Sequence, residues 1–321
     1  MRLPGAGSGP RMAPLRRRPK QLTEPPALFR AGTGPPVVTD GAADRGAGAA
    51  DGAAGGQGTL VTGRRARLRD VAELLEDRPA DPEVAAMAQR IARRLAIRRR
   101  SREHRGERGA GRIASMPYRY RSDDIDLDRT LEVLTERPVP EDTDIVVRER
   151  VRTRRDVVLV VDVSGSMRGE KVRIAAATVA ALSADLAGGG DRLALVAFWS
   201  DAALLAPLDA PVPADRLLAQ LLRIPARGLT DVGFALAAAH AELARSTARR
   251  RTTVLLSDAV HNAGPDPRLI ARRLPELHVL LEADGEHDAP LAADLARLGR
   301  GRLAPIRTHR DVAPALNRLL A

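Results

Sequence analysis

From residue 156 onward, short apolar runs alternate with segments whose apolar residues recur at helical spacing. The first apolar run, 157–161, predicts a buried strand, because a strand covered on both faces reads as an unbroken hydrophobic stretch. Helical spacing follows over 170–187. The same succession predicts strands over 192–199, 202–206, 252–257, 277–282 and 302–306, and helices over 213–223, 232–247, 267–273, 288–298 and 311–320.

This succession predicts the fold class of the region 156–321. Strands that alternate with helices of this length indicate an α/β domain with a doubly wound, mostly parallel sheet and helices on both faces. The strands 192–199 and 202–206 are joined by a turn that is too short for a parallel crossover. We therefore expect these two strands to form a hairpin and to supply one antiparallel edge strand.

The region before residue 156 has a different pattern. Residues 1–63 are dominated by Gly, Ala, Pro and Arg, and we expect them to be disordered because they bury too little apolar surface to offset chain entropy. Residues 64–155 are predicted as a basic helical region with an extended lead-in. Its predicted elements are helices over 65–76, 81–100 and 122–136, and an edge strand or extended lead-in over 145–154.

The loop after the strand 157–161 carries three oxygen-bearing side chains at alternate positions: Asp162, Ser164 and Ser166. Open α/β sheets place their ligand sites at the carboxyl ends of strands, where this loop lies. Oxygen ligands suit a hard cation such as Mg²⁺. The alternative is that Ser164 and Ser166 only cap the helix that follows.

Two further polar residues are predicted at the same edge of the sheet. Thr230 lies in a loop that opens a helix, and Asp258 directly follows the apolar strand 252–257. Because the carboxyl ends of parallel strands converge on one edge, these residues can meet the loop at 162–166. Their arrival favours a cation site over simple helix capping.

These five residues, in this order and spacing, resemble the metal-ion-dependent adhesion site of the von Willebrand factor type A family. The resemblance covers 156–321 and implies a Rossmann-like fold that binds Mg²⁺, with Mn²⁺ or Ca²⁺ as substitutes. It also implies that the hydroxyl residues ligate the ion, that the aspartates act largely through water, and that a partner's carboxylate fills an open position. Leu229 and Ala259 depart from the pattern, because many relatives have glycine there.

The basic lead-in and the placement of this domain resemble bacterial cytoplasmic members of the family. These are the proteins paired with MoxR-type AAA+ ATPases and the D subunits of magnesium chelatases. The resemblance implies a Mg²⁺-dependent adaptor that works with an AAA+ ATPase in the assembly or maturation of a client complex. A chelatase D-like subunit of a metal-insertion complex is the alternative.

Composition and motifs narrow the classes of function. The chain has no cysteine, which removes thiolate metal sites, disulfides and cysteine nucleophiles. No apolar run is long enough for a membrane span and no secretion signal is evident, so we expect a cytoplasmic protein. The segment 165–172 lacks the phosphate-binding pattern of Gly, four residues, Gly-Lys-Ser/Thr, so ATP hydrolysis would come from a partner. We expect no enzyme activity from the chain by itself.

The sequence leaves two alternatives to the adaptor interpretation, and the first is a hydrolase. A hydrolase would use Ser164 as nucleophile with Asp258 and either His287 or His309, but the nucleophile elbow requires glycines where this chain has Asp162 and Ser166.

Nucleic-acid binding is the second class. The net charge of +11 lies almost wholly before residue 156, and arginines cluster over 64–121. Such clusters can neutralise phosphates. Interleaved acidic residues and scarce aromatic residues favour a docking surface for protein instead.

Overall fold

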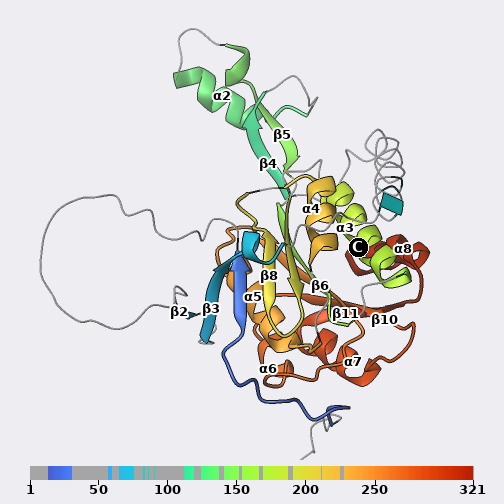
Figure 1. Ribbon diagram of the computed structural model, residues 1–321. Helices are drawn as coiled ribbons and strands as arrows, with labels where there is room; N and C mark the ends of the chain where they lie inside the picture. The colour runs from blue at the N-terminus through green and yellow to red at the C-terminus, as the bar shows by residue number, and fades with distance from the viewer. Residues whose placement is uncertain are drawn as a thin grey trace, which may run out of the picture.

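The computed structural model is built around a mixed sheet of nine strands in the order β11-β10-β9-β6-β7-β8-β1-β3-β2, together with a separate pair, β4-β5 (Figure 1). The residues that the structure describes are 14–30, 57–59, 65–75, 82–83, 86, 90, 112–118, 124–136, 141–151, 154–165, 169–186, 191–210, 212–224 and 228–320.

The elements follow one another along the chain. The strands are β1 (Ala27–Arg30), β2 (Gln57–Thr59), β3 (Arg65–Asp70), β4 (Arg112–Pro117), β5 (Val146–Val151), β6 (Arg155–Asp162), β7 (Arg192–Phe198), β8 (Ala202–Ala206), β9 (Arg250–Ser257), β10 (Leu277–Glu282) and β11 (Arg300–Ile306). The helices are α2 (Leu127–Glu136), α3 (Glu170–Leu186), α4 (Ala214–Arg223), α5 (Val232–Ala244), α6 (Arg268–Ala271), α7 (Ala289–Leu298) and α8 (His309–Leu320), with 3₁₀ turns η1 (Val71–Glu73) and η2 (Asp142–Asp144).

Strand β6 lies inside the sheet and is buried on both faces. Its residues Leu159 and Val161 pack into the apolar cluster formed with α3, α4 and α8. Val158 and Val160 pack into the opposite cluster, formed with α5, α6 and α7. Because alternate side chains of a strand point to opposite faces, the unbroken apolar run supplies both cores.

The order of the parallel strands creates a switch point beside β6. The chain passes from β6 through α3 to β7 on one side, and it later places β9 on the other side of β6. Ligand sites of open α/β sheets lie at such points, outside the carboxyl ends of the strands. The predicted fold class, a doubly wound and mostly parallel sheet with helices on both faces, is confirmed.

The antiparallel strand is not at the edge where it was predicted. β8 pairs antiparallel with β7, as the short turn requires, but β1 pairs with its other side. β3 then adds to β1, and β2 closes this side of the sheet antiparallel to β3. The prediction missed this extension because β1 and β8 are far apart in the sequence, so no short-range pattern connects them.

Two predictions about the N-terminal region are wrong within the described residues. Residues 65–76 were predicted as a helix, but 65–70 form strand β3 and only 71–73 turn as 3₁₀ helix. The expected disorder of 1–63 does not hold for 14–30 and 57–59, which include β1 and β2. Pairing with the sheet satisfies the backbone of these short segments, which their composition alone does not reveal.

The other N-terminal predictions have mixed outcomes. The helix predicted over 122–136 is present as α2 from Leu127 onward. The segment 145–154 is not an edge strand of the main sheet, because β5 pairs with β4 in a separate hairpin-like sheet beside α2 (Figure 1). Most of the helix predicted over 81–100 lies outside the described residues. Among the described helices, none combines the length and the apolar character needed to cross a bilayer.

Candidate metal centre

Asp162 is the last residue of β6, and its carboxylate is held by hydrogen bonds on both oxygens. Oδ1 accepts from the backbone N–H of Ser164 at 2.9 Å, and Oδ2 accepts from the Ser257 hydroxyl at 2.6 Å. The side chain is buried at the switch point between β6 and β9. A carboxylate bound in this way is fixed in direction before any ligand arrives.

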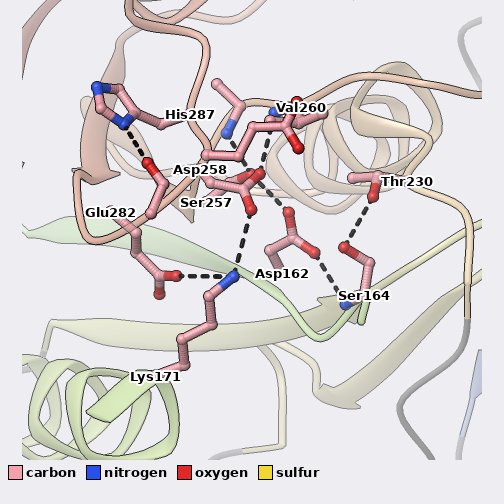
Figure 2. Close-up of polar contacts among 12 residues, drawn as sticks. Asp162, Ser164, Lys171, Thr230, Ser257, Asp258, Val260, Glu282 and His287 are labelled. Atoms are coloured by element: carbon pink, nitrogen blue, oxygen red, sulfur yellow. Dashed lines mark hydrogen bonds and ion pairs between the residues drawn. The ribbon is translucent and has the colours of Figure 1, made fainter. Parts of the chain in front are cut away.

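Ser164 and Thr230 bring two hydroxyls together from different loops. The Thr230 hydroxyl donates to Ser164 Oγ at 2.7 Å, although the residues are 66 positions apart (Figure 2). Thr230 is 4% exposed and directly precedes Asp231, whose side chain caps α5 by accepting from the N–H of Phe234. The cap holds the start of the helix and therefore the position of Thr230.

Asp258 directly follows β9. It lies beside Asp162, on the side away from Ser164 and Thr230 (Figure 2). Its Oδ1 accepts from the N–H of Val260 at 3.0 Å, and its Oδ2 accepts from Lys171 Nζ at 3.3 Å. The next residue, Ala259, has a positive φ of 60° and is fully buried. A left-handed conformation disfavours any residue with a Cβ, which gives the physical reason why glycine suits this position.

Four of the five predicted site residues are therefore brought together: Asp162, Ser164, Thr230 and Asp258. They come from the end of β6 and the loop after it, from the loop after β9, and from the loop before α5. The fifth, Ser166, lies outside the described residues.

The centre gathers three carboxyl groups, those of Asp162, Asp258 and Glu282, in a poorly solvated place. Burial, and then the Asp258 carboxylate, raise the pKa of Asp162 to about 6. Burial, and then Asp162, raise the pKa of Glu282 to about 8. Burial opposes the charge of Lys171, but Asp258 and Glu282 outweigh it and raise the pKa of this lysine. One ammonium group thus faces three carboxyl groups, an arrangement that favours an additional cation.

The donor set fits a hard divalent ion. Asp162 and Asp258 each accept two hydrogen bonds, which leaves part of the acceptor capacity of each carboxylate for water or a cation. Within the described part of the chain, no three His, Cys, Asp or Glu side chains converge as a metal site. A cation here would therefore depend on the hydroxyls and on water, as Mg²⁺ often does.

Three residues of the centre were not predicted from the sequence: Ser257, Lys171 and Glu282. Glu282 had a signal, because it ends the apolar strand β10 as Asp162 ends β6. Ser257 also ends a strand, directly before Asp258. Lys171 had no such signal in the sequence, because it lies in the first turn of α3 and not at the end of a strand. Its side chain reaches the centre from there, with Nζ 4.0 Å from Glu282 Oε2 (Figure 2).

The two histidines considered for a hydrolase have other partners. His309 Nδ1 lies 2.6 Å from Glu170 Oε1, a contact that joins the start of α8 to the start of α3. His287 Nδ1 lies 2.9 Å from the carbonyl oxygen of Gly285. The Ser164 hydroxyl instead accepts from Thr230. This geometry does not assemble the Ser-Asp-His arrangement of a hydrolase.

Comparison with known proteins identifies the domain that carries the centre. Residues 157–261 match the family model of the von Willebrand factor type A domain. The chain is 38% identical over 142 residues to the uncharacterized protein Rv2850c of Mycobacterium tuberculosis, a match that covers 41% of this chain. The chain spans about a fifth of that relative's length, 21%.

Solved structures with a similar fold share little sequence with this chain. A von Willebrand factor type A protein from Catenulispora acidiphila has a TM-score of 0.43 at 17% identity, covering 54% of this chain and 43% of that one. The manganese-loaded TRAP protein of Plasmodium vivax has a TM-score of 0.43 at 16% identity, covering 53% and 74%. An aerotolerance-related membrane protein from Bacteroides fragilis has a TM-score of 0.41 at 16% identity, covering 51% and 98%.

Proposed function

We propose that the von Willebrand factor type A domain of this chain binds a divalent cation, Mg²⁺ in the cell, and thereby captures a carboxylate of a partner protein. Domains of this type commonly mediate protein interactions and metal-dependent binding. The observation that carries the proposal is the 2.7 Å contact between the hydroxyls of Ser164 and Thr230, set beside buried carboxylates at the switch point of the sheet.

Each residue of the centre has a defined part in this proposal. Ser164 and Thr230 would hold the cation directly, and Asp162 and Asp258 would hold it through water. Because the hydroxyls are neutral, a bound Mg²⁺ keeps enough positive charge to attract an external Asp or Glu side chain. Ser257 keeps the Asp162 carboxylate in one orientation. Mn²⁺ or Ca²⁺ should substitute in solution.

The family resemblance supports a proposal for the partner. We propose a cytoplasmic AAA+ ATPase of the MoxR type as the partner, with this chain as a non-enzymatic adaptor that presents a client protein for assembly or maturation. In the alternative, a chelatase D-like role in metal insertion, the same site would work with a different AAA+ ATPase. The identity of the proteins captured with Mg²⁺ distinguishes the two roles.

Substitution of Asp162 tests the metal-dependent mechanism. Asp162→Ala should abolish Mg²⁺-dependent capture of partner proteins from cell extract and weaken Mn²⁺ binding at least about tenfold, because the fixed carboxylate is lost. Asp162→Asn should have the same effect while keeping hydrogen-bond partners for Ser164 and Ser257. Isothermal titration calorimetry measures the affinity, and circular dichroism confirms the fold.

Asp209→Ala is the matched control, because this exposed aspartate follows β8, which runs opposite to β6, and pairs with Arg245. It should bind Mn²⁺ as the unchanged protein does. If Asp162→Ala captures the same proteins as the unchanged protein, or if EDTA has no effect on capture, the mechanism is wrong.

A further inference from the structure

A segment from the N-terminal region lies directly against the loop that follows β9. Residues 14–26, which we name the N-terminal strap, precede β1. Lys20 forms a parallel bridge with Ala263. The N–H of Lys20 donates to the carbonyl of Asn262 at 2.8 Å, and the N–H of Gly264 donates to the carbonyl of Lys20 at 3.2 Å. The strap therefore pairs with 262–264 through backbone hydrogen bonds, which do not depend on the side chain of Lys20.

Contacts on both sides of Lys20 hold the strap in place. Arg17 donates to both carboxylate oxygens of Glu286, at 2.9 and 2.7 Å, in the loop after β10. Leu15 packs against the apolar cluster of α5, α6 and α7. At the other end, the N–H of Ala27 donates to Asp201 Oδ1 at 2.7 Å, where β1 joins β8. The strap thus crosses the edge of the sheet at which β9 and β10 end (Figure 1).

Asn262 connects this pairing to the candidate metal centre. Its side-chain Oδ1 accepts from the N–H of Thr230 at 2.7 Å. The N–H groups of Asn262 and Ala263 both donate to the carbonyl of Thr230, each at 3.2 Å. Both backbone polar groups of Thr230 are therefore held by the residues that pair with the strap, while its hydroxyl reaches Ser164.

We propose that the N-terminal strap supports the cation site by holding Thr230 in position. Asn262 is the positioning residue that connects the strap to Thr230. The effect on cation affinity rests on the proposed function, whereas the link from strap to Thr230 does not. Groups that orient metal ligands are commonly worth about tenfold or more in affinity, since a ligand in the wrong direction coordinates poorly.

Lys20 offers a matched pair of variants. Lys20→Pro removes the N–H that donates to Asn262 and should disrupt the bridge. Lys20→Ala keeps the backbone and removes only an exposed side chain. Lys20→Pro should speed hydrogen exchange of the Thr230 amide and weaken Mn²⁺ binding at least about threefold. Lys20→Ala should leave both unchanged.

Asn262 offers a second pair with a conservative rescue. Asn262→Ala removes the acceptor for Thr230 and should weaken Mn²⁺ binding about tenfold, with faster exchange of the Thr230 amide. Asn262→Asp keeps an acceptor oxygen at this position. It should preserve the slow exchange and bind Mn²⁺ at least as tightly as the unchanged protein.

Exchange measured by nuclear magnetic resonance and affinity measured by calorimetry, both on the full chain, separate the outcomes. A Thr230 amide that exchanges at the unchanged rate in Lys20→Pro overturns the role of the strap. Equal effects of Asn262→Ala and Asn262→Asp overturn the role of Asn262. If the unchanged protein binds no Mn²⁺, the proposed function fails, and the exchange rates alone still decide the link from strap to Thr230.

Discussion

Glu282 is a buried carboxyl group whose pKa is shifted by burial and by the other charged residues of the centre. It ends β10, is 5% exposed, and lies 4.0 Å from Lys171 Nζ. Its pKa is raised from 4.5 to about 8, first by burial and then by Asp162. The folded protein therefore keeps a proton here at a pH where the unfolded chain releases it.

This difference predicts how stability depends on pH. Below pH 4.5 both states carry the proton, so Glu282 has no net effect. As the pH rises from 4.5 through 8, only the unfolded state releases the proton, so the free energy of unfolding falls. Glu282→Gln removes the effect. Between pH 5 and pH 8 the variant should gain stability over the unchanged protein by at most about 4 kcal/mol.

Urea unfolding at both pH values, followed by the fluorescence of Trp199, measures this difference. Trp199 is the single tryptophan of the chain and is buried. Glu132→Gln, which alters an exposed glutamate of α2, is the control for the loss of one carboxyl group. A stability difference between Glu282→Gln and the unchanged protein that stays constant from pH 5 to pH 8 would contradict the assignment.

At the scale of elements, the loop between β9 and α6 depends on a close approach of two segments. Gly264 has a φ of +77°, and a Cβ at this position would lie 2.1 Å from Asp231 Oδ2. Asp231 caps α5 and is fully buried, so its side chain has little room to move. The glycine therefore permits the contact between this loop and the start of α5.

Gly264→Ala should destabilise the protein by about 2 to 5 kcal/mol, because a left-handed alanine and a steric clash both act against the fold. Gly169→Ala is a matched control: its φ is also positive, +59°, but a Cβ there would meet nothing within 4 Å. It should lose only about 1 to 2 kcal/mol. Chemical denaturation measures both, and equal losses would show that the contact with Asp231 is unimportant.

At the scale of the whole molecule, the N-terminal region and the von Willebrand factor type A domain share one sheet. Phe29 of β1 is 5% exposed, and its ring stacks on Trp199 with centroids 6.0 Å apart. Arg69 of β3 also lies over the Phe29 ring, with its guanidinium carbon Cζ 5.1 Å from the ring centroid. Residues of the N-terminal region therefore belong to the same apolar cluster as residues of β6 and β7.

Phe29→Ala should lower the free energy of unfolding of the whole sheet by about 3 to 5 kcal/mol, because a buried aromatic ring is lost. Unfolding should stay a single transition when followed by Trp199 fluorescence and by far-ultraviolet circular dichroism. Two separate transitions, or no change in midpoint, would mean that β1 is only loosely attached to the sheet.

The elements from residue 156 onward, and four residues of the candidate metal centre, could be predicted from the sequence. The unbroken apolar run before Asp162 is typical of a strand covered on both faces, and parallel strands bring their carboxyl ends to one edge. Asp162, Ser164, Thr230 and Asp258 could therefore be predicted together. Glu282 obeyed the same rule and could have been predicted with them.

The surroundings of that candidate centre could be known only from the fold. Lys171 reaches it from a helix whose sequence pattern reports burial and not the direction of one long side chain. β1 and the strap join the sheet through backbone hydrogen bonds, which any residue except proline can make and which leave no trace in side-chain pattern. For that reason the sequence predicted a candidate cation site, whereas only the fold shows that Asn262, which pairs with Lys20, also hydrogen-bonds with Thr230.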